Sequence, residues 1–121
     1  MIALALLLAA SAVPQSLLDK ADAAGLAQTQ CLFSVFRAAR QAHLSSGEFG
    51  AQLRSTCSAE SLQLRTVSAR IFTLRGEANP SARAQRMIDE SYSSMVEEYR
   101  RFPEKEKLVT DFCKTDPKDC S

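Results

Sequence analysis

The chain has 121 residues, a formal net charge of +1, and hydrophobic residues at 45% of its positions. This length suits one domain, and the near-neutral charge argues against nucleic-acid binding, because proteins that bind nucleic acid usually carry a strongly basic surface. The sequence therefore predicts one globular domain with no nucleic-acid partner.

The first sixteen residues contain no charged side chain, and an apolar run from Ile2 leads into Ala10-Ser11-Ala12. Small residues at these positions are typical of a signal-peptidase cleavage site. The run is about half of the roughly 20 apolar residues that a membrane-spanning helix requires. We therefore expect a signal peptide at 1–12, a single helical domain at 13–121, no membrane span, and a periplasmic or secreted location.

Helices are predicted almost throughout, because β-branched residues are sparse and the four Gly and four Pro lie mostly near segment ends. The first predicted helix spans 16–44. Its apolar stripe repeats at three- and four-residue steps. The members of this stripe are Leu18, Ala21, Leu32, Val35, Ala39 and Ala42.

A second helix is predicted over 48–75, with Gly76 as its C-terminal cap. Its apolar seam consists of Leu53, Cys57, Leu64, Val67, Ile71 and Leu74 and also includes Glu60. A charged residue on this seam has two explanations. The helix breaks at Thr56-Cys57-Ser58, so that Ser58 caps a new helix with Glu60 in its first turn, or Glu60 is a buried catalytic carboxylate. We favour the break.

A third helix is predicted to begin at Asn79-Pro80, with Asn as the N-cap and Pro at the first helical position. Pro103 is expected to end or kink it, and a short fourth helix is predicted over 104–113. These elements predict an all-α fold, namely an antiparallel three-helix bundle with the short C-terminal helix folded across it.

Four cysteines in an exported chain of this size favour two disulfides over free thiols. Cys31 and Cys57 are symmetric about residue 44, so an antiparallel hairpin of the first two helices would place them opposite each other. Small neighbours there would allow the close approach that a disulfide needs. By elimination, Cys113 is expected to pair with Cys120.

The basic residues are unevenly distributed along the chain. Residues 31–86 contain eight Arg and three acidic residues, a balance of +5, whereas residues 87–121 contain six basic and nine acidic residues, a balance of −3. Either the two regions pack together and their charges pair, or the arginines form a face for an anionic partner. The candidate interaction residues are Arg54, Arg65, Arg75, Arg83 and Arg86.

Two aromatic residues lie one position off the predicted apolar stripes, Phe33 in the first helix and Phe72 in the second. If both were exposed they would form an apolar patch of the kind that marks a partner site. A place in the core or in a dimer seam is the simpler explanation.

No pattern of catalytic nucleophile and base and no metal-binding motif is present, and we expect no enzyme activity and no cofactor. The leading hypothesis is an exported, non-enzymatic protein that binds another protein or an anionic envelope component. The alternative is a small-ligand or haem carrier, in which His43, the single histidine, pairs with Met87 or Met95. A capping or surface role for His43 is simpler.

Overall fold

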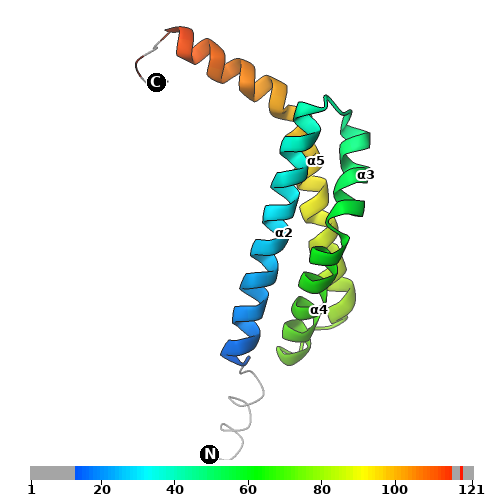
Figure 1. Ribbon diagram of the computed structural model, residues 1–121. Coiled ribbons are helices and arrows are strands. Elements are labelled where there is room, and N and C mark those ends of the chain that lie inside the picture. Colours follow the sequence, from blue (N-terminus) through cyan, green and yellow to red (C-terminus); the bar gives the residue numbers. More distant parts are fainter. Residues whose placement is uncertain (1–12, 116–117, 119–121) are drawn as a thin grey trace, which may run out of the picture.

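The computed structural model describes residues 13–115 and residue 118, so residues 1–12, where the signal peptide is predicted, lie outside the described part. In the described part the chain forms four helices and no strand (Figure 1). They are α2 (Gln15–Gln41), α3 (Ser46–Thr56), α4 (Ser58–Leu74) and α5 (Pro80–Thr115). The all-α prediction is confirmed. None of these helices is both long and apolar enough to cross a membrane.

Helix α2 ends three residues earlier than predicted, in a tight cap. The amide of His43 donates to the carbonyl of Arg40, and the amide of Leu44 donates to that of Ala39, which is the hydrogen-bond pattern of a Schellman motif. His43 occupies the left-handed position of this motif, with φ 55°. Ser45 then caps α3 in a reciprocal capping box with Glu48.

The predicted second helix is broken at Cys57, as the position of Glu60 suggested. Cys57 ends α3 and begins α4 with φ −99° and ψ 16°. The expected cap at Ser58 is wrong, because the Ser58 hydroxyl donates backwards to the carbonyl of Ser55 at 3.2 Å. Glu60 lies in the first turn of α4, where the helix dipole favours an acidic residue.

The predicted third and fourth helices form one continuous helix, α5, with Pro103 inside it. Proline lacks the amide hydrogen that would bond one turn back, which weakens and bends a helix without necessarily ending it. The C-terminal part is not folded across the bundle, contrary to the prediction. It turns away from the bundle beyond the ends of α2 and α3 (Figure 1), and residues 103–112 are all exposed.

The core lies where the α3–α4 rod packs against α2 on one side and α5 on the other. Phe49, Leu53 and Cys57 are completely buried at its centre. Phe49 stacks on Tyr99 with ring centroids 4.2 Å apart, and Phe36 packs edge-on against both rings. This aromatic cluster joins α2, α3 and α5 at the end of the bundle that carries Pro103.

Candidate functional site

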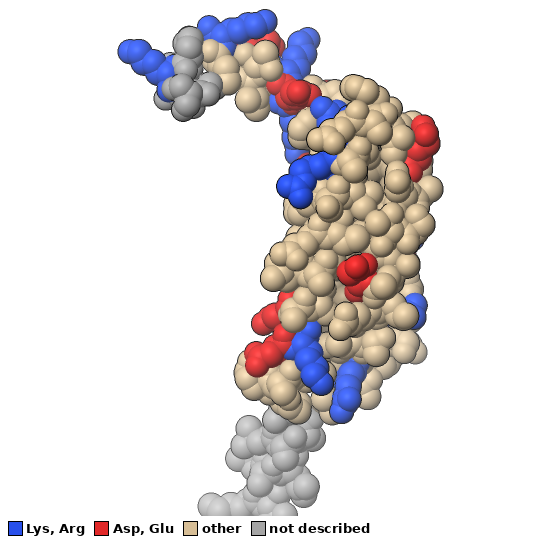
Figure 2. Space-filling view, viewed as in Figure 1, with Lys and Arg blue, Asp and Glu red and all other residues tan. Residues whose placement is uncertain are grey.

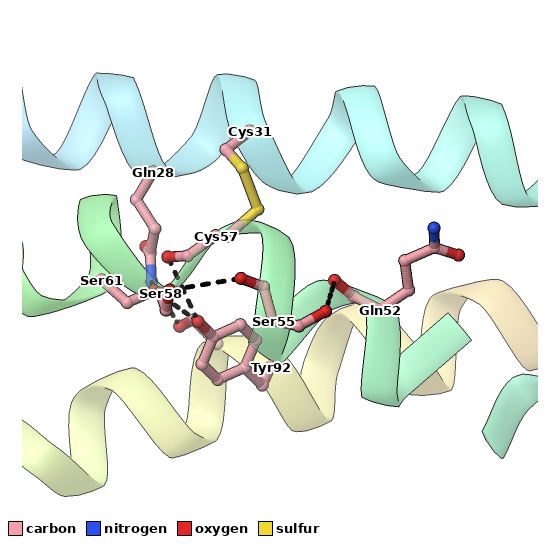
Figure 3. The surroundings of a disulfide bond; sticks show 9 residues. Gln28, Cys31, Gln52, Ser55, Cys57, Ser58, Ser61 and Tyr92 are labelled. Carbon is pink, nitrogen blue, oxygen red and sulfur yellow. Dashed lines mark hydrogen bonds between the residues drawn. A yellow bond between two sulfur atoms is a disulfide. The ribbon is translucent and has the colours of Figure 1, made fainter. Parts of the chain in front are cut away.

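The disulfide between Cys31 and Cys57 ties α2 to the junction of α3 and α4 (Figure 3). The two Cα atoms are 5.8 Å apart, so the helices approach closely there. This predicted pair is confirmed. The predicted Cys113–Cys120 pair includes Cys120, which lies outside the described residues, and it stays a prediction.

Beside the disulfide, a buried polar network crosses the bundle interior (Figure 3). The Gln28 amide donates to the hydroxyls of Ser61 at 3.3 Å and Ser91 at 3.2 Å. The Tyr92 hydroxyl lies 2.5 Å from that of Ser61 and 3.5 Å from the carbonyl of Cys57. The network thus satisfies polar groups from α2, α4 and α5 in the interior.

Two of the predicted interaction residues, Arg54 and Arg65, flank a surface pocket of about 190 Å³ between the α3–α4 rod and α5. Side-chain hydroxyls and apolar side chains share its lining. The hydroxyls come from Ser58, Ser61 and Tyr92, and the apolar side chains are Leu62 and Ile88. The pocket therefore has apolar walls beside two positive charges, while its hydroxyls are engaged within the protein: Ser58 donates to the carbonyl of Ser55, and Ser61 and Tyr92 bond to each other.

Contacts across α5 hold these two arginines at the pocket. Arg65 donates to the side-chain oxygen of Gln85 at 2.7 Å, and the Gln85 amide donates to Asp89 at 3.1 Å. Asp89 also lies 3.6 Å from the Arg54 guanidinium, which sits 4.8 Å from the centroid of the Tyr92 ring. This series of contacts contains two guanidiniums and one carboxylate, so its formal charge is +1.

The other three predicted arginines lie near the loop between α4 and α5. Arg83 forms an ion pair with Glu77 and stacks over the ring of Phe72, 4.5 Å from its centroid. Arg83 and Arg86 also line a second pocket of about 280 Å³ with Phe72. Arg75 is the exposed C-terminal cap of α4. The structure thus divides the predicted basic face into two groups along α4 and α5.

The arginines differ in whether they pair internally. Arg54 and Arg83 contact carboxylates, whereas Arg65, Arg75 and Arg86 form no ion pair within residues 13–115. Among the other acids of α5, Glu106 pairs with Arg40, a further arginine of residues 31–86, whereas Glu97 pairs with Arg100 of α5 itself. Internal neutralisation therefore accounts for only part of the arginine set.

Phe33 and Phe72 do not form a common patch. Phe33 is 53% exposed on α2, close to the level of the disulfide, whereas Phe72 lies fifteen residues beyond Cys57 and is covered by Arg83. At 1.5 Å per residue this separates them by roughly 20 Å along the bundle.

A groove that the sequence analysis missed lies between α2 and the α3–α4 rod. Its volume is about 640 Å³, and mostly small or uncharged side chains line it, together with Glu60. One oxygen of Glu60 is buried there without a hydrogen-bond partner. A signal for this face was present in the sequence, because α2 carries no charged residue from 23 to 36.

His43 has the capping role that the left-handed turn after α2 requires, and its side chain is exposed. It borders a surface pocket of about 340 Å³ with Arg40 and Arg100 rather than facing the interior. The residues that the structure describes contain no cluster of three or more His, Cys, Asp or Glu side chains placed to hold a metal ion.

No model of a known protein family matches the chain, and no curated protein or solved structure is significantly similar to it. The function is therefore argued from the geometry of these sites.

Proposed function

We propose that the protein is an exported, non-enzymatic binding protein that recognises an acidic segment of another protein through the arginines along α4 and α5. The observation that carries the proposal is the contact chain Arg54–Asp89–Gln85–Arg65, which presents two guanidiniums against one carboxylate. One further carboxylate would balance its charge, and the guanidinium fork matches a carboxylate in geometry.

The pocket between these arginines favours a peptide side chain over a bare charged surface. Its apolar walls, Leu62 and Ile88, lie between the Arg54 and Arg65 side chains, so the methylene groups of a Glu side chain would contact apolar surface while its carboxylate accepts from a guanidinium. Arg75 and Arg86 extend the positive charge toward the loop. An acidic segment could then follow the α4–α5 face over several residues.

The proposal is tested with a fluorescent poly-glutamate peptide and the purified protein, by fluorescence anisotropy over a range of salt concentrations. Binding should weaken as salt rises, because charges are screened beyond about 10 Å at 0.1 M and about 3 Å at 1 M ionic strength. Arg65→Glu and Arg86→Glu should each weaken binding roughly tenfold, since each puts a like charge opposite the peptide.

The matched control is Arg37→Glu, which reverses an exposed arginine on α2, away from the pocket. It should leave peptide binding close to that of the wild type. An equal loss of peptide affinity in all three variants would show that only the net charge of the protein matters, and would contradict a defined binding site. Tighter binding to phosphatidylglycerol vesicles than to the peptide would contradict an acidic protein partner and indicate an anionic envelope surface as the partner. Unfolding midpoints distinguish lost binding from lost stability.

A further inference from the structure

Helix α2 carries an exposed apolar pair on the side that faces away from the core. Leu26 is 59% exposed and Phe33 is 53% exposed. Two full turns separate them, which places them on one side of the helix, about 10 Å from each other. The side chains that α2 buries, such as Ala24, Gln28 and Val35, lie on the opposite side. Large apolar side chains exposed together on one helix face are typical of an interaction surface.

One acidic and one basic residue flank this pair on the same side of α2. Asp22 lies one turn before Leu26, and Arg37 lies one turn after Phe33. Both are exposed, and neither forms an ion pair within residues 13–115. The segment 23–36 between them contains no charged residue, and Figure 2 shows little charge along the middle of the bundle. We call Asp22, Leu26, Phe33 and Arg37 the outer stripe of α2.

The outer stripe is symmetric in position and opposite in charge at its two ends. Its midpoint lies between positions 29 and 30, and Leu26 and Phe33 are equidistant from this point, as are Asp22 and Arg37. A second copy of α2 that runs antiparallel about this midpoint would place Leu26 against Phe33 and Asp22 against Arg37, each twice. A parallel arrangement would bring like charges together at both ends, which is unfavourable.

The rest of the described chain leaves the outer stripe open. The C-terminal part of α5 meets α2 at Arg40, whose guanidinium donates to Glu106 at 2.8 Å. From there it turns away from the bundle (Figure 1). Arg40 lies beyond Arg37 on α2, so this contact borders the end of the stripe and leaves Leu26 and Phe33 exposed.

We propose that two copies of the chain form an antiparallel dimer through the outer stripes of their α2 helices. Two apolar side chains from each copy would leave water at the centre, and an ion pair between Asp22 and Arg37 would lie at each end, with the two pairs about 22 Å apart. The ion pairs would set the direction and register of the helices. The arginines of α4 and α5 lie on other helices, so this dimer is independent of the acidic-partner proposal.

Sedimentation equilibrium of the purified protein over a range of concentrations tests the dimer. The wild type should reach the mass of two chains by about 0.1 mM, because a contact between single helices is small and its affinity modest. Phe33→Asp should raise the dissociation constant roughly 30-fold or more, as expected for a central aromatic contact. Arg70→Asp, which reverses an exposed charge on α4, is the control and should dimerise as the wild type does.

Charge reversal tests the antiparallel register. Asp22→Arg and Arg37→Asp should each raise the dissociation constant roughly tenfold, because each places like charges together at both ends of the contact. Mixing these two variants should restore dimers, since each chain then offers the charge that its partner requires. A wild type that stays monomeric, a Phe33→Asp variant that dimerises normally, or a mixture that dimerises no better than its components would overturn the proposal. All four substituted positions are exposed, and unchanged unfolding midpoints would show that the variants fold.

Discussion

Hydrogen bonds from their hydroxyl groups, as well as packing of their rings, hold the two tyrosines of α5 in position. Tyr99 donates to the carbonyl of Leu44 at 2.6 Å and so binds the end of α2, whereas Tyr92 bonds to Ser61 in the interior. Both tyrosine side chains are buried. Their hydrogen bonds depend on partners 31 and 55 residues away, which a periodic pattern does not reveal.

We expect Tyr92→Phe to lower the free energy of unfolding by about 1 kcal/mol, the usual net contribution of one buried hydrogen bond. Ser61 would keep its bond from Gln28, so the loss should be no larger. Urea unfolding measures the change. Thr29→Ala, at an exposed position of α2, is the control and should stay within about 0.5 kcal/mol of the wild type. If Tyr92→Phe lowered the free energy of unfolding no more than Thr29→Ala, the hydrogen bonds of Tyr92 would contribute little to stability.

The hydrogen bond from Arg100 lowers the pKa of the Glu97 carboxyl, with a smaller contribution from Arg101. The stabilisation is therefore present above the ordinary pKa of Glu and is lost as the pH falls through the lowered value. Arg100→Ala should raise the pKa of Glu97 toward its ordinary value, measured by NMR titration of the carboxyl carbon. Arg101→Ala should raise it less, and the reverse order would contradict this assignment.

At the level of the helices, two caps of similar geometry contain different residues. The left-handed residue directly after the C-terminal cap is His43 in α2 and Gly76 in α4, with φ values of 55° and 73°. Glycine adopts this conformation without strain, whereas other residues are strained by roughly 1 kcal/mol. The non-glycine residue His43 in this conformation should therefore cost a measurable amount of folding free energy.

His43→Gly should stabilise the protein by about 0.5 kcal/mol, because the relieved strain exceeds the entropy that glycine adds to the unfolded chain. Gly76→Ala should destabilise it by about 1 kcal/mol. No atom lies within 4 Å of a Cβ at Gly76, so the backbone conformation alone causes that loss. Thermal unfolding of both variants should show shifts of opposite sign, and shifts of the same sign would refute this explanation.

The helices that the sequence predicted are present, and the differences arise at their ends. Periodicity identified the break at Cys57 through the position of Glu60, because it depends on neighbours within a few turns. It could not decide whether Pro103 ends or bends a helix, since that depends on contacts such as Arg40 with Glu106. Composition likewise identified the arginines, but their pairing required the packing of α5 against α4.

At the level of the whole molecule, the arginine pocket and the groove beside the disulfide lie on different sides of the α3–α4 rod. The arginine pocket lies where this rod meets α5, and the groove lies where it meets α2. A partner bound at the pocket would therefore leave the groove open.

Both surfaces depend on the disulfide, because Cys31 and Cys57 set the distance between α2 and the rod at its midpoint. The bond joins residues 26 positions apart, and closing a loop of this size stabilises a fold by roughly 3.5 kcal/mol. We expect the double variant Cys31→Ala/Cys57→Ala to lower the melting temperature by about 15 °C. Thermal unfolding followed by circular dichroism measures this change. The double variant removes only this disulfide, whereas a reducing agent would also act on Cys113. An unchanged melting temperature would show that packing alone holds the two helices together, and that an oxidising compartment is not needed for the fold.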